Sequence, residues 1–267
     1  MNHLLRSHAP ISDEGWALID EEARQRLTPG LAARRLVDFG GPHGWTHSAT
    51  SLGRVEAVGP VAEGVDVRRR RVLPLVELRA PFAISRDELR DGDRGAADVD
   101  LDDLDRAAQR LAEAENAAVF HGAPEDGITG IVPASPHPAI ELGADPATYA
   151  AAVAHAVDLL KRNGLEGPYG LALSREEWTR VVETSEHGGY PLFEHLALIL
   201  GGPIVWAPGV RGAVALSLRG GDFLFDAGQD IAIGYEGHDA DAVALYLEES
   251  FSFRSVTPEA AVAIGSA

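Results

Sequence analysis

Residues 220–253 read GGDFLFDAGQDIAIGYEGHDADAVALYLEESFSF, and the predicted fold is built around them. Two glycines and an aspartate predict a turn at its start, and two runs of alternating apolar and polar residues follow. In the second run, one face of a strand would carry apolar residues, interrupted only by Glu249: Val243, Leu245, Leu247, Phe251 and Phe253. The other face would carry Ala244, Tyr246, Glu248, Ser250 and Ser252. This alternation predicts a half-buried strand of about ten residues, longer than the usual five or six, and therefore a large sheet.

The composition is that of a globular protein. The chain has 267 residues, of which 45% are hydrophobic and 24% charged, enough for one large core or for one core with an inserted lobe. No apolar run approaches the roughly 18 residues of a membrane span, and the N-terminus does not read as a signal peptide. The sequence contains no cysteine, which excludes disulfides and thiolate chemistry and fits a cytoplasmic protein.

The charge balance is strongly acidic. A net charge of −18 argues against nucleic acid and against an anionic membrane as partners of the whole chain. The exception is a basic run of four residues, Arg68, Arg69, Arg70 and Arg71, inside a segment with the pattern of extended strands. Two interpretations of this run stay open: a solvated loop, or a surface that pairs with acidic groups of a neighbouring chain.

The first half of the chain predicts a helix, a hairpin and a longer helix. Ser12 or Asp13 can cap the first helix, which Pro29 would end or kink. Residues 51–84 have strand patterning, and because an isolated two-stranded ribbon is marginal in water, we expect the hairpin to lie on another surface. Helical spacing with an acidic first turn predicts a long helix over residues 101–120.

The segment 135–219 predicts a compact α/β lobe between the long helix and the final strands. Ser174 and Glu177 have the spacing of a capping box and would begin a helix directly after a strand at residues 169–173. A glycine-rich loop at residues 185–191 would precede a second helix at residues 192–200.

No motif in the sequence predicts catalysis. The chain has no G-x-S-x-G elbow, no phosphate-binding loop, no G-x-G-x-x-G after a strand and no H-E-x-x-H. His43 and His47 are four residues apart, but the glycine and tryptophan between them disfavour a helix, so we assign no metal site. Asp102 and Asp103 lie at a predicted helix start, where capping and solvation explain them. We therefore predict no catalytic residues.

A series of motifs occurs in order along the whole chain. They are LRSHAP at residues 5–10, RRLVD at 34–38, GPHGW at 41–45, LPLVELR at 73–79, FHG at 120–122, GPY at 167–169, GGYP at 188–191, RGGDF at 219–223, GQDIAIGY at 228–235 and ESFSF at 249–253. In these motifs the chain closely resembles the encapsulins, the shell proteins of bacterial and archaeal nanocompartments. Ala33 stands where the family often has a glycine, which is a mild departure.

The resemblance implies an α+β structure with the HK-97-like phage capsid fold. The N-terminal helix and arm would comprise residues 1–50, the extended E-loop residues 51–80, the peripheral domain residues 81–134 and 220–267, and the axial domain residues 135–219. It also implies self-assembly into an icosahedral, cytoplasmic nanocompartment. The short N-terminal region is similar to that of the smallest members, so we expect sixty copies. The four arginines of the E-loop would then meet a neighbouring subunit.

The resemblance also implies that the shell captures cargo enzymes through a C-terminal peptide on its inner wall. By position, Arg34 and Asp38 would be the polar contacts of that peptide. The apolar groove would be formed by Leu31, Leu36, Ile231 and Ile233, although ordinary packing is an equal alternative for the two isoleucines. Family cargoes include dye-decolourising haem peroxidases and ferritin-like iron oxidases, and the composition slightly favours a peroxidase.

Three further expectations concern the pore, the cofactor and other protein classes. Glu186 and His187 would line the five-fold pore, where a ring of histidines would change charge between about pH 5 and 8. Some relatives bind flavin through an aromatic residue just after the E-loop, but residues 85–88 read SRDE, so we expect no flavin and no other cofactor. The alternatives are a viral major capsid protein, or a hydrolase or bacteriocin, as the older name of the family suggests.

Overall fold

The long strand near the C-terminus organises the larger of the two main sheets. In the computed structural model, which describes residues 3–143, 148–185 and 189–265, this strand is β10 (Ala242–Ser255). Along one edge β10 pairs antiparallel with β4 (Val76–Ser85). Along its other edge it pairs with β9 (Ala232–His238) and then with β8 (Phe223–Ala227), to which β1 (Asp38–Gly40) adds in parallel.

Both faces of β10 are covered, whereas the sequence predicted a half-buried strand. The apolar face packs beneath the helices, and Val243, Leu245 and Leu247 are fully buried there. The opposite face is buried as well at Tyr246 and Ser252. The reason is local: the guanidinium of Arg79 lies 3.5 Å from the Tyr246 ring, and the hydroxyl groups of Ser252 and Thr50 are 2.7 Å apart. Alternation therefore predicted the direction of the side chains but not the covering of the polar face.

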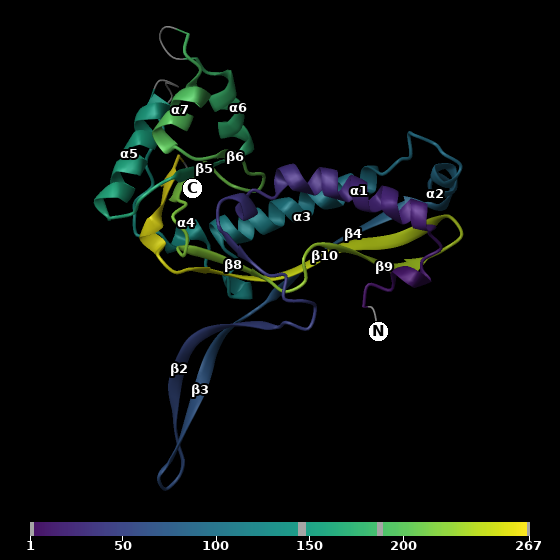
Figure 1. Cartoon of the computed structure of the whole chain (residues 1–267), viewed down its shortest axis with the longest axis horizontal. Helices are drawn as coiled ribbons and strands as arrows, with labels where there is room; N and C mark the ends of the chain where they lie inside the picture. Colours follow the sequence, from purple (N-terminus) through teal and green to yellow (C-terminus); the bar gives the residue numbers. More distant parts are fainter. Residues whose placement is uncertain (1–2, 144–147, 186–188, 266–267) are drawn as a thin grey trace.

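Helices cover one face of this sheet. These are α1 (Asp13–Gly30), α2 (Arg86–Asp93) and α3 (Asp102–His121), and Figure 1 shows α1 and α3 lying side by side over the strands. The Ser12 hydroxyl caps α1 by accepting a hydrogen bond from the Gly15 amide, as predicted. The sequence did not predict α2, because its single buried apolar residue, Leu89, is too little to set a helical period in an acidic segment.

The predicted hairpin projects away from the body of the molecule (Figure 1). It consists of β2 (Ala49–Ala62) and β3 (Val65–Pro74), which pair only with each other among the described strands. The hairpin carries six well-exposed valines: Val55, Val58, Val61, Val65, Val67 and Val72. It ends at Pro74, and residues 76–80 belong instead to β4, so the range 51–80 that we expected for the E-loop extends into the large sheet.

The second lobe is built on a four-stranded sheet with the order β11, β7, β5, β6. Its strands are β5 (Tyr169–Leu173), β6 (Ile204–Trp206), β7 (Ala213–Ser217) and β11 (Ala261–Ile264). Its helices are α4 (Ile131–Ala134), α5 (Thr148–Arg162), α6 (Arg175–Glu183) and α7 (Leu192–Leu200). Because β11 pairs with β7, the last residues of the segment 220–267 complete this sheet rather than the larger one.

Short 3-10 turns connect several of these elements. They are η1 (Arg6–His8), η2 (Ala33–Arg35), η3 (Pro124–Asp126) and η4 (Pro258–Ala260). Among the described residues, no helix combines the length and the apolar character needed to cross a membrane.

Candidate functional site

A groove of about 450 Å³ lies between α1 and the start of β9. It brings together Leu31 and Arg34, which follow α1, and Ile231 and Ile233, which belong to the segment around the start of β9. Ile231 is partly buried, whereas Ile233 is 3% exposed and also part of the core beneath the helices. Four of the six residues that the resemblance placed at a cargo site therefore share one groove.

The wall of the groove formed by α1 continues the helix's buried face. Ala23 and Leu27 are buried and point to the core, and Leu31 follows at the same helical spacing with part of its side chain accessible. Arg6 and Asp20 also line the groove, and two hydrogen bonds of 3.0 and 2.6 Å join the guanidinium to the carboxylate. An apolar floor is thus flanked by an ion pair.

Arg34 forms the charged side of the groove and is held by three carboxylates. Its Nε donates to Glu115 at 2.6 Å, one terminal nitrogen to Asp230 at 2.7 Å and the other to Glu249 at 2.6 Å. The side chain of Arg34 is only 15% exposed, whereas that of Asp230 is 45% exposed. Glu249, the one polar interruption in the apolar face of β10, is therefore the partner of this buried arginine.

The electrostatics of this cluster are set by burial. Glu115 and Glu249 are 0% and 1% exposed, and burial raises the pKa of both carboxyl groups, that of Glu249 well above its usual value. Burial alone would lower the pKa of Arg34, but the neighbouring carboxylates outweigh it and raise that pKa instead. Burial therefore disfavours the charged form of both carboxyl groups, whereas the surrounding carboxylates favour the charged form of the guanidinium.

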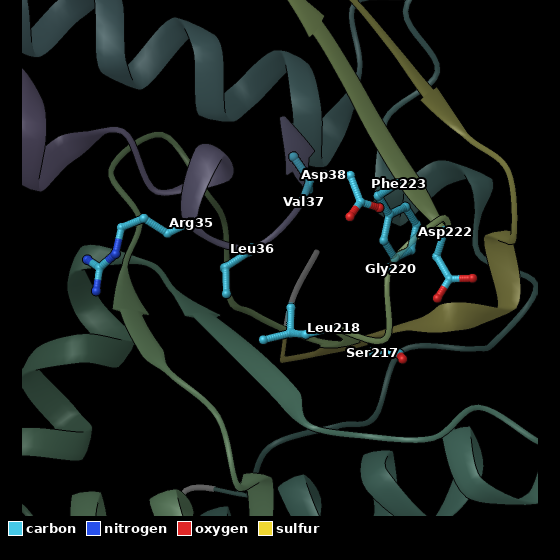
Figure 2. A pocket seen from close by; sticks show the side chains of 9 residues that line it. All are labelled: Arg35, Leu36, Val37, Asp38, Ser217, Leu218, Gly220, Asp222 and Phe223. Atoms are coloured by element: carbon cyan, nitrogen blue, oxygen red, sulfur yellow. The ribbon is translucent and has the colours of Figure 1, made fainter. Parts of the chain in front are cut away.

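The structure does not place Leu36 and Asp38 in the groove. Both line a separate cavity of about 180 Å³ beside the loop that precedes β8 (Figure 2). Leu36 directly follows the 3-10 turn η2 and is buried against the second lobe, where a Cβ at Gly170 would lie 2.6 Å from it. The carboxylate of Asp38 accepts a hydrogen bond of 2.6 Å from the Gly221 amide. Sequence position alone could not show that Leu36 and Asp38 lie outside the groove.

Several residues at the groove were not predicted from the sequence, among them Asp20 and Asp230. Asp20 lies on the same face of α1 as Ala23 and Leu27, so helical spacing could have indicated it. Asp230 directly precedes Ile231 in the matched motif, but its pairing with Arg34 joins segments 196 residues apart in the chain. No local signal reports such a contact.

The other predicted site residues lie elsewhere. Arg68, Arg69, Arg70 and Arg71 are exposed on β3, and Arg69 is 3.5 Å from Glu56 across the hairpin. Glu186 and His187, the predicted pore residues, lie outside the described residues. Ser185, which precedes them, and Pro191, which follows them, form a β-bridge with each other.

Comparison with known proteins assigns the family. A family model described as encapsulating protein for peroxidase matches residues 1–252. The type 1 encapsulin shell protein of Rhodospirillum rubrum is 49% identical over 268 residues, covering 98% of this chain and 96% of that protein. The chain belongs to the encapsulin family. The corresponding shell protein of Mycobacterium tuberculosis is 42% identical and covers 99% of both chains.

Solved structures agree on the fold. The crystal structure of a virus-like particle from Pyrococcus furiosus aligns with a TM-score of 0.63 at 18% identity, covering 94% of this chain and 97% of the other. A structure from Mycobacterium phage Bobi aligns with a TM-score of 0.59 at 14% identity, covering 89% and 90%. The HK-97-like capsid fold is thereby confirmed, and this encapsulin chain is a structural protein of a capsid-like shell rather than an enzyme.

Proposed function

We propose that sixty copies of this chain close into an icosahedral shell that encloses a cargo enzyme, and that the cargo's C-terminal peptide binds in the groove between α1 and β9. The observation that supports this proposal is the groove itself, in which Leu31, Ile231 and Ile233 form an apolar floor beside charged groups. The proposed cargo is a haem peroxidase of the dye-decolourising class, because the matching family model names a peroxidase. A ferritin-like protein is the alternative cargo.

The lining of the groove would suit an extended peptide with apolar residues at alternate positions. In an extended chain, alternate side chains point to the same side and can enter one apolar floor. The half-exposed carboxylate of Asp230 and the accessible face of the Arg6–Asp20 ion pair would accept or donate hydrogen bonds at the edges. Because all three guanidinium nitrogens of Arg34 already bind carboxylates, its proposed role is to hold the floor in place rather than to bind the peptide alone.

The remaining predicted residues serve the shell in this proposal. The exposed valines of the hairpin would be covered by a neighbouring subunit, and the four arginines of β3 would pair with its acidic surface. Glu186 and His187 would line the pore at the five-fold vertex. The net charge of −18 would keep the assembled particles apart in solution.

Co-expression with a reporter carrying the C-terminal segment of a peroxidase tests the groove. Ile231→Asp would place a charge on the apolar floor, so we expect intact particles that retain little reporter, whereas Ile231→Leu should load as the parent does. Loading is measured as reporter per particle after size-exclusion chromatography. Full loading of Ile231→Asp particles would overturn the assignment of the groove. A second reporter carries the C-terminal segment of a ferritin-like protein. If the shell captures only this second reporter, the ferritin-like protein replaces the peroxidase as the proposed cargo.

A further inference from the structure

A cluster of two histidines and one aspartate lies where the hairpin leaves the body of the chain. His43 and His47 belong to the loop before β2, and Asp226 lies on β8. One ligand atom from each residue lies within 4.8 Å of the other two. The Nε2 atom of His43 is 3.0 Å from a carboxylate oxygen of Asp226, and the two imidazole rings are 4.8 Å apart between centroids.

His47 supplies the second observation. Its Nε2 atom is buried and has no hydrogen-bond partner among the described residues. A buried polar atom without a partner costs free energy, so native structures rarely retain one without a reason. Here the imidazole belongs to a group in which every member offers a lone pair to a cation, and a bound cation would satisfy it.

Hydrogen bonds from neighbouring residues orient the carboxylate of Asp226, as is common for the ligands of bound metals. Its second carboxylate oxygen accepts a hydrogen bond of 2.7 Å from the Thr50 hydroxyl, which in turn lies 2.7 Å from the hydroxyl of Ser252. Such an outer layer orients a ligating carboxylate and keeps one oxygen directed toward the metal. Thr50 and Ser252 are buried, so this support comes from the packed part of the sheet.

The ligand set and its spacing select a class of metal. Two imidazoles and a carboxylate suit Zn²⁺ and related divalent transition metals, with a fourth position left for water. In a tetrahedral zinc site with bonds of about 2.0–2.1 Å, neighbouring ligand atoms lie about 3.3 Å apart. The 3.0 Å pair of His43 and Asp226 already fits this spacing, and His43 is an exposed side chain whose ring can turn.

We propose that His43, His47 and Asp226 bind one divalent transition-metal ion per chain, represented by Zn²⁺. The ion would join the loop before the hairpin to β8 of the large sheet. Since β2 begins at Ala49, two residues after His47, the ion would fix the direction in which the hairpin leaves the body. A bound ion would therefore restrict the motion of the hairpin, which in the proposed function contacts neighbouring subunits. The sequence brings only two of the three ligands close together, because Asp226 is 179 residues beyond His47.

Titration of the purified shell tests the site directly. The protein is first dialysed against a chelator and then titrated with Zn²⁺ by calorimetry and with Co²⁺ by visible absorption, which reports tetrahedral coordination. We expect saturation at one ion per chain, and His47→Gln should weaken binding by at least about tenfold. The matched control is His155→Gln, an exposed histidine on α5, which should leave the binding unchanged.

Three results would overturn the site: no saturable binding at one ion per chain, unchanged binding by His47→Gln, or an equal loss in His155→Gln. The last would show that scattered surface histidines hold the metal. If His47→Gln does not assemble, the titration is repeated with His43→Gln, which replaces a more exposed ligand. Zn²⁺ binding by His43→Gln that equals that of the parent would then overturn the site. A metal-dependent rise in the thermal midpoint of the parent that is absent from the variant supports the structural role.

Discussion

At the scale of single residues, Arg34 connects the groove to the core. It lines the groove and also pairs with two buried carboxylates, Glu115 and Glu249, and the second pairing explains why a glutamate interrupts the apolar face of β10. Breaking a buried ion pair by removing one partner is costly, because the other charge stays buried and uncompensated. The same residue therefore supports the fold and the shape of the groove.

Replacement of Arg34 tests its structural role. Arg34→Met leaves two buried acids without their counter-ion, so we expect a loss of about 3–5 kcal/mol in the free energy of unfolding and a lower thermal midpoint. The matched control is Arg24→Met on α1, whose guanidinium is exposed and pairs with an exposed Glu21. Scanning calorimetry compares the two, and an equal change in both midpoints would contradict the account.

The pH dependence of stability follows from Glu249. Burial raises the pKa of this carboxyl group in the folded state well above 4.5, so between 4.5 and the raised value the folded chain binds more protons than the unfolded chain. Stability from this group is therefore full below about pH 4.5 and is lost as the pH rises through the folded pKa.

Glu249→Gln isolates this contribution, because glutamine resembles the protonated acid at every pH. Thermal midpoints are measured for parent and variant across the window above pH 4.5. We expect the parent to lose stability relative to the variant as the pH rises. A difference between the two that stays constant with pH would show that Glu249 does not titrate in this range.

At the scale of elements, prediction from sequence succeeded where an element carries its own periodic signal. The helix α3 (Asp102–His121) and the strand β10 have long apolar patterns, and both lie within a few residues of their predicted bounds. The strand β11 (Ala261–Ile264) was missed as part of the second lobe, because four residues cannot show which distant strand they join. Likewise, Leu31 and Arg34 line the same groove, whereas Leu36, which follows η2, lines a separate cavity.

The hairpin β2–β3 is expected to act in assembly of the shell. It has six exposed valines and pairs with no other described strand, so its surface should matter for assembly but not for folding of the chain. Reversing Arg68, Arg69, Arg70 and Arg71 to glutamate should leave the circular dichroism spectrum unchanged and abolish closed particles. The control is Arg24→Gln on α1. Light scattering that shows full-size particles for the reversed variant would contradict this role.

At the scale of the whole molecule, the chain is a subunit whose surfaces are only partly covered by itself. The hairpin projects from the body (Figure 1). The second lobe presents an exposed leucine, Leu198, on α7. The chain belongs to the encapsulin family of shell proteins, so we propose that neighbouring copies in the shell cover these surfaces. In the proposed function, the groove between α1 and β9 is the surface of that shell to which the cargo peptide would bind.

Electron cryomicroscopy of particles co-expressed with a peroxidase that carries its C-terminal segment would show whether the shell binds cargo in this groove. We predict closed icosahedral particles of sixty chains, with extended peptide density along Leu31, Ile231 and Ile233 on the inner wall. Particles without that segment should show the same groove without the density. Peptide density at another surface, or a protein that forms no closed particles, would contradict the account.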